Sequence, residues 1–198
     1  MDFSLENPLA DSHEFHFDTI PSDLFLIESD HMPSKIFREI IDFDESFRRE
    51  AVSSVLRVAC NFDPSLSYLA VNYLDRFLSS HGIPGDGGFV FDAKTIQKME
   101  VLILGALNWR MRSVTPFSFI SFFISLFKPE DPPLKQALKA RASEIIFKAQ
   151  NDINLWEFKP SLIAASALLY ASQELFPMQF LCFRKAISNC SYVNKVNF

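Results

Sequence analysis

A single carboxylate on an apolar helix face is the first feature of this sequence that points to chemistry. Glu100 shares its predicted face with four apolar residues one or two turns away, Ile96, Ile103, Leu104 and Leu107. Burying an unpaired carboxylate costs on the order of several kcal/mol. Glu100 therefore either meets a partner group at an interface or lies at the edge of the apolar stripe and reaches water.

Two large apolar residues, Trp109 and Met111, follow the same helix. The charged residues Arg110 and Arg112 lie next to Trp109 and Met111 in the sequence. Aromatic side chains next to arginine are typical of the anchors of protein interfaces. Packing in an ordinary core is the alternative, and the residues alone favour neither.

No constellation typical of catalysis or of metal binding occurs in the sequence. The three cysteines, Cys60, Cys182 and Cys190, form no C-x-x-C pair, and the four histidines are scattered. The sequence has no phosphate-binding glycine loop, G-x-S-x-G or H-E-x-x-H motif, and the glycines of residues 85–88 follow no predicted strand. We therefore expect no enzyme, no cofactor and no bound metal.

The elements that position these residues have helical periodicity. From Leu66 to Leu78, apolar residues recur at spacings of three and four, which predicts an amphipathic helix. Asp63 and Pro64 are its predicted N-cap and first turn. Other helices are predicted over residues 35–41, 45–61, 92–107, 116–127, 134–151, 160–175 and 178–188, with loops at 81–88 and 128–133. We predict an all-α fold in which residues 161–175, apolar around their circumference, form a completely surrounded central helix.

Composition and charge narrow the class of protein. The 198 residues are 48% apolar, with 22 Phe and 5 Gly, and carry a formal net charge of −5. Residues 1–30 hold eight acids and no Lys or Arg, so we expect an acidic flexible tail there and a mildly basic remainder of +3. Without a dense basic patch, a leader sequence or an apolar run of membrane-spanning length, we expect an intracellular, soluble protein of the nucleus or cytoplasm that binds neither nucleic acid nor membrane.

Several long segments of this sequence resemble the corresponding segments of one protein family. LAVNYLDRFLS, at 69–79, resembles the second helix of a cyclin box, and FRREAVSSVLRVACNF, at 47–62, resembles the first. The words at 89–123, RASEIIF at 141–147 and FKPSLIAASALLYAS at 158–172 follow in the family's order, and HMPSK precedes the first box. Together they resemble the plant D-type cyclins. The resemblance implies a cyclin fold of two helical boxes: an incomplete first box, residues 31–112, and a truncated second box, residues 113–198.

The sequence departs from the family in four places. Residues 81–88 stand where the family has two further helices, which include the central helix of the first box and a kinase-contacting Lys. We therefore expect Leu69, Tyr73 and Phe77 to be less buried than matching residues of the second box. The L-x-C-x-E word that docks retinoblastoma-type proteins is absent from the head, which argues against such a partner. Ser54 replaces a family Trp that helps to bind substrate docking peptides, and the chain stops soon after the fourth helix of the second box, as a short form would.

The resemblance also implies roles for single residues. Glu100 matches the family's kinase-contacting Glu, and Trp109 and Met111 match apolar positions that pack on the kinase. Arg48 and Asp75 match a pair of opposite charges that ties the first two box helices together. The alternative for Arg48 and Asp75 is two unrelated solvated charges.

Three functions follow as hypotheses. The first is a cyclin, the regulatory subunit that binds and activates a cyclin-dependent protein kinase to control cell-cycle progression at the G1/S transition. The second is a cyclin-fold interaction protein that has lost productive kinase binding, which the missing helices favour. The third, a cyclin-fold general transcription factor, needs a basic face and usually a zinc ribbon, and the composition argues against both.

Overall fold

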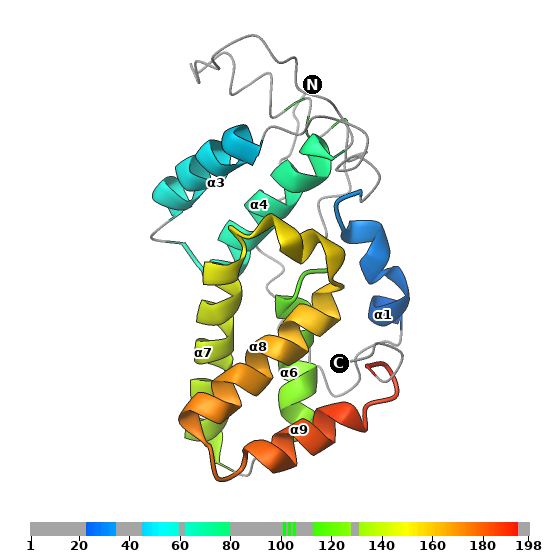
Figure 1. Ribbon diagram of the computed structural model, residues 1–198, viewed down its shortest axis with the longest axis vertical. Helices are drawn as coiled ribbons and strands as arrows, with labels where there is room; N and C mark the ends of the chain where they lie inside the picture. Colours follow the sequence, from blue (N-terminus) through cyan, green and yellow to red (C-terminus); the bar gives the residue numbers. More distant parts are fainter. Residues whose placement is uncertain are drawn as a thin grey trace, which may run out of the picture.

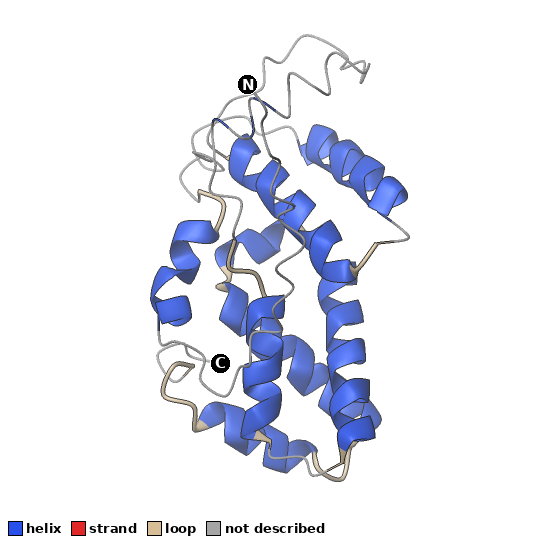
Figure 2. Ribbon diagram, turned by 180° about the vertical axis from the view of Figure 1, so that it is seen from behind, coloured by secondary structure: helices blue, strands red, loops and turns tan. Residues whose placement is uncertain are grey.

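The computed structural model describes residues 23–34, 45–59, 62–79, 113–127 and 131–193, together with Val101, Ile103 and Gly105. These residues form α1 (Asp23–Ile27), η1 (Glu28–His31), α3 (Glu45–Ala59), α4 (Pro64–Leu78), α6 (Phe117–Leu126), α7 (Pro132–Ala149), η2 (Ile153–Glu157), α8 (Pro160–Leu175) and α9 (Phe180–Ser188). None of the described residues lies in a strand (Figure 2), which confirms the all-α prediction for this part of the chain. The predicted helix at 35–41 and most of that at 92–107 lie outside the described residues.

The start of α4 shows how local sequence sets a helix boundary. The Asp63 carboxylate accepts a hydrogen bond from the backbone N–H of Ser65 at 2.8 Å, and Pro64 occupies the first turn. A side chain at the N-cap satisfies one of the backbone donors that a helix start leaves free, and proline has no such donor to lose there. The predicted cap is therefore confirmed.

The described residues contain two apolar cores of unequal burial. In the first box, α3 and α4 pack together, but Leu74 remains 9% exposed, Phe77 8% exposed, and Leu69 and Tyr73 are only half-buried. In the second box, α6, α7 and α9 pack against α8 (Figure 1). Its core residues Phe119, Phe123, Leu138, Ala142, Ile146, Ala164, Leu168 and Ala171 have no exposed surface. Leu69 and Tyr73 are therefore less buried than these residues, as predicted, whereas Phe77 is as buried as Phe25 and Cys190 at the edge of the second core.

The central helix α8 is not completely surrounded, and this part of the prediction is wrong. Ser166, Tyr170 and Gln173 lie on one exposed stripe of α8, and Tyr170 is 61% exposed. The stripe borders an apolar groove of about 460 Å³ between α7 and α8, whose lining includes Ile145 and Ile163. An apolar circumference shows that a helix can be buried on every side, but it does not determine how many neighbouring helices the fold supplies.

The acidic head is not a flexible tail throughout, because residues 23–31 form α1 and η1 and lie on the second box (Figure 1). Phe25 is part of the core of the second box, and Glu28 is 1% exposed. Three residues beyond η1, the Ser34 N–H donates to Ser79 Oγ, at the end of α4, at 2.9 Å. The expected tail is therefore wrong for residues 23–30, whereas residues 1–22 lie outside the described part of the chain.

Candidate functional site

A buried ion pair joins the two described helices of the first box. Arg48 of α3 donates from Nε to Asp75 Oδ1 and from Nη2 to Asp75 Oδ2, both at 2.8 Å. The two side chains are 4% and 7% exposed. Two parallel hydrogen bonds between a guanidinium and a carboxylate fix orientation as well as distance. The structure thus brings together two residues that the sequence separates by 27 positions.

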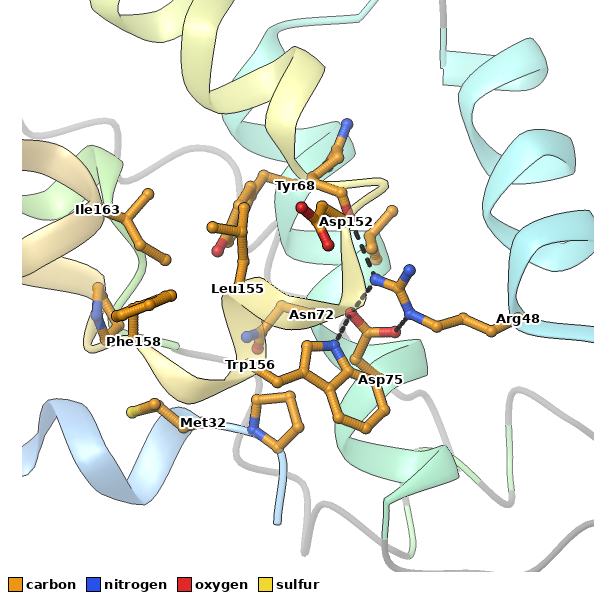
Figure 3. A pocket seen from close by; sticks show the side chains of 14 residues that line it. Met32, Arg48, Tyr68, Asn72, Asp75, Asp152, Leu155, Trp156, Phe158 and Ile163 are labelled. Carbon is orange, nitrogen blue, oxygen red and sulfur yellow. Dashed lines mark hydrogen bonds and ion pairs between the residues drawn. The ribbon is translucent and has the colours of Figure 1, made fainter. Parts of the chain in front are cut away.

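The same guanidinium reaches the second box (Figure 3). Arg48 Nη1 donates to the carbonyl oxygen of Asn151 at 2.9 Å and Nη2 donates to that of Gln150 at 3.1 Å, at the C-terminal end of α7. Trp156 of η2 donates from Nε1 to Asp75 Oδ2 at 2.9 Å, and Arg48 lies 5.5 Å from the centroid of the Trp156 ring. We call Arg48, Asp75, Trp156 and the two carbonyl groups the Arg48 hub. It connects α3 and α4 of the first box with α7 and η2 of the second.

The electrostatics of the Arg48 hub reflect its burial. Desolvation raises the pKa of the Asp75 carboxyl above its ordinary value, although hydrogen bonds from Arg48 and Trp156 act in the opposite direction. Desolvation also raises the pKa of the neighbouring Tyr68, and the negative charge of Asp75 adds to this effect while Arg48 opposes it. A cation at the C-terminal end of a helix such as α7 is favoured by the helix dipole. The polar groups of the hub satisfy one another at the contact between the boxes, so removing any one of them would leave a buried group unpaired.

The surroundings of the Arg48 hub do not suit a cofactor or a substrate. The cavity beside it has a volume of about 30 Å³ and is lined by residues of both boxes, among them Tyr68 of α4 and Leu155 of η2. Pockets for small molecules usually measure about 300–1,000 Å³. In the described parts of the chain, no group of three or more His, Cys, Asp or Glu side chains could hold a metal ion. Among those same residues, no helix combines the length and the apolar character that a bilayer crossing requires.

Comparisons with known proteins decide the family. A family model described as the cyclin C-terminal domain matches residues 114–196. The putative cyclin-D6-1 of Arabidopsis thaliana is 45% identical over 240 residues, which cover 98% of this chain and 80% of the relative. The chain belongs to the plant D-type cyclins. Cyclin-D6-1 of Oryza sativa subsp. japonica is 31% identical over 98% of this chain and 70% of its own length. Cyclin-D1-1 of Arabidopsis thaliana is 36% identical over 67% of this chain and 49% of its own length.

Because the chain is a cyclin, the described helices can be assigned to a cyclin domain and the chain to a general role. The helices α6, α7, α8 and α9 lie within the matched C-terminal domain and form the second box of an all-α cyclin fold. Cyclins are regulatory subunits and not themselves enzymes, so this chain has a regulatory role. The match to the putative cyclin-D6-1 of Arabidopsis extends over 240 positions, more than the 198 residues of this chain. The Arabidopsis protein therefore has residues within the match that this chain lacks.

The three residues predicted to contact a kinase, Glu100, Trp109 and Met111, lie outside the described residues. Two neighbours of Glu100 are described. Val101 is 62% exposed, whereas Ile103 packs against the apolar core of the first box.

Sequence reasoning missed two side chains that join distant parts of this cyclin, Trp156 and Glu28. Trp156 lies between two helices and donates to a carboxylate 81 positions away, and no local pattern signals such a contact. Glu28 hydrogen-bonds to Ser161, 133 positions away. A signal for Glu28 did exist: it directly follows the apolar run 24–27, which is unusual for a solvated acidic tail.

Proposed function

We propose that this D-type cyclin binds a cyclin-dependent protein kinase and activates it at the G1/S transition, in the nucleus or cytoplasm. The observation that carries the proposal is its 45% identity with a plant D-type cyclin over 98% of the chain. The cyclin surface would press on the mobile helix of the kinase, which would bring the kinase's own Lys–Glu pair and activation loop into the active arrangement. The kinase supplies all of the chemistry, and the cyclin supplies a surface of fixed shape.

The Arg48 hub suits this role because a regulator of this kind needs its two boxes in one orientation. Four hydrogen bonds from one guanidinium, two of them to the other box, resist rotation of one box against the other. A positioned surface retains its shape when the kinase binds, so less of the binding free energy is lost in ordering it.

We further propose that kinase binding by this chain is weak. Glu100, Trp109 and Met111 are present, but the family's partner Lys and its helix have no counterpart in the sequence. Losing one partner of a desolvated charge pair typically costs about 2–5 kcal/mol, which is roughly 30- to 4,000-fold in affinity. The missing apolar surface would weaken binding further.

An interaction protein that has lost productive kinase binding is the second candidate. The half-buried Leu69 and Tyr73 favour it, since their helix α4 lies against fewer described neighbours than α8 of the second box does. A less well packed box presents a less rigid surface to a kinase. The two candidates differ in one measurable property, activation.

A kinase assay separates the two functions. The full chain is added to a purified plant cyclin-dependent kinase, and phosphate transfer to a substrate peptide is compared with that of the kinase alone. Activation that falls in Trp109→Ala and Met111→Ala, but not in the control Glu50→Ala at an exposed position of α3, supports the regulatory subunit. Binding without activation supports the second candidate, and the absence of both contradicts the proposal.

A further inference from the structure

The short segment α1–η1, residues 23–31, buries two side chains spaced three residues apart against the second box, and Leu24 packs beside them, partly buried. Phe25 and Glu28 are 8% and 1% exposed, whereas their neighbours Leu26 and Asp30 point to solvent, Leu26 with 77% of its surface. Side chains three positions apart lie on one face of a helix. The most buried groups that the segment presents to the second box are therefore one aromatic ring and one carboxylate.

The aromatic ring enters a socket of other aromatic side chains. Phe25 stacks on Tyr192 with ring centroids 4.4 Å apart and an interplanar angle of 10°. Its ring centroid lies 4.8 Å from that of Phe119 and 5.5 Å from that of Phe122, both of α6. Offset-stacked and edge-on aromatic contacts at such distances stabilise beyond the apolar area that they bury.

The carboxylate meets the first turn of the central helix α8. Glu28 Oε2 accepts a hydrogen bond from the Ser161 N–H at 2.9 Å, Oε1 accepts one from Ser161 Oγ at 3.0 Å, and Lys159 Nζ lies 3.5 Å from Oε1. The N-cap residue of α8, Lys159, makes no side-chain cap of its own. A carboxylate at a helix start satisfies free N–H groups and interacts favourably with the helix dipole. Glu28 thus caps a helix to which it does not belong.

We propose that the second box carries a docking site for a short helix with an aromatic residue and a carboxylate three positions apart, and that the chain's own residues 23–31 occupy it as an intramolecular ligand. The socket of Phe119, Phe122 and Tyr192 binds the ring, and Ser161 with Lys159 binds the carboxylate. The site is separable: a segment of the same pattern from another molecule exchanges with the intramolecular one. This inference does not rest on kinase activation.

The experiment cuts the chain after the α1–η1 segment and measures whether an added peptide replaces that segment on the second box. A recognition sequence for a specific protease is placed between residues 36 and 43 of the full chain, and the folded protein is cut. A labelled synthetic peptide of residues 22–34 is then added, and its binding is followed by fluorescence anisotropy, with retention of the cut fragment followed by size-exclusion chromatography. All substitutions are made in the peptide, so the fold of the cyclin is the same in every measurement.

We expect the cut fragment to stay bound at micromolar concentration and to be displaced by the unaltered peptide. Phe25→Ala in the peptide should weaken binding by more than about 100-fold, and Glu28→Gln by about 5- to 30-fold. The matched controls Leu26→Ala and Asp30→Asn should bind as the unaltered peptide does. Equal binding by all five peptides, no exchange at all, or loss of the helical circular-dichroism signal when the fragment leaves would each overturn the proposal.

Discussion

Replacing Arg48 by Met removes the centre of the Arg48 hub while retaining much of its apolar volume. The substitution leaves the carboxylate of Asp75, whose side chain is 7% exposed, with one hydrogen bond from Trp156, and it removes a donor from two carbonyl groups at the end of α7. Breaking a buried ion pair from one side typically costs about 3–5 kcal/mol. Because domains are stable by about 5–15 kcal/mol in total, we expect a large part of the free energy of unfolding to be lost.

Urea unfolding followed by circular dichroism measures this loss, since the midpoint and the slope together give the free energy of unfolding. The matched control is Arg141→Met, which removes a surface arginine, 27% exposed, that pairs with the exposed Glu144 and Glu174 and should change stability far less. The double variant Arg48→Met/Asp75→Leu should recover part of the loss, because no unpaired buried charge remains. A loss below about 1 kcal/mol for Arg48→Met, the size of an exposed ion pair, would refute the assignment of the hub as a buried junction.

Three further predictions test other parts of the structure. Trp156→Phe removes the indole donor to the hub carboxylate and should cost about 1.5–3 kcal/mol in the same urea experiment. The pKa of Glu144 is lowered, chiefly by its hydrogen bond from Lys148. The ionised Glu144 therefore stabilises the fold at neutral pH, and this contribution is lost as the pH falls through the lowered pKa. Glu144→Gln should accordingly lower Tm at pH 7 but not in strong acid. Ala164→Leu, on the buried side of α8, should cost about 1–3 kcal/mol by overpacking, whereas Ser166→Leu on the open side should stay within about 0.5 kcal/mol.

The parts of the fold that depend on neighbours in sequence were predictable. The N-cap and first turn of α4 follow from Asp63 and Pro64, and the helical class follows from apolar spacing. The approach of Arg48 to Asp75 followed from resemblance, because two isolated charges 27 positions apart do not reveal a contact. Hydrogen-bond partners at that distance depend on how helices pack, and the sequence of either helix does not contain that information.

The parts that depend on tertiary context were missed. Glu28 was counted with a solvated acidic head, although its partner at the start of α8 makes it one of the most buried charged residues described. The open side of α8 escaped prediction for a related reason. Its alanines allow close approach of helices from any direction, and only the arrangement of α6, α7 and α9 determines which direction stays open.

The most direct test of the proposed function is the affinity of the purified chain for a plant cyclin-dependent kinase, measured beside a plant D-type cyclin whose two boxes are complete. We predict that this chain binds about 30- to 4,000-fold more weakly than the complete cyclin, and that Glu100→Ala weakens it again. Affinity equal to that of the complete cyclin, unchanged by Glu100→Ala, would contradict both the weakness of the interaction and the role of Glu100.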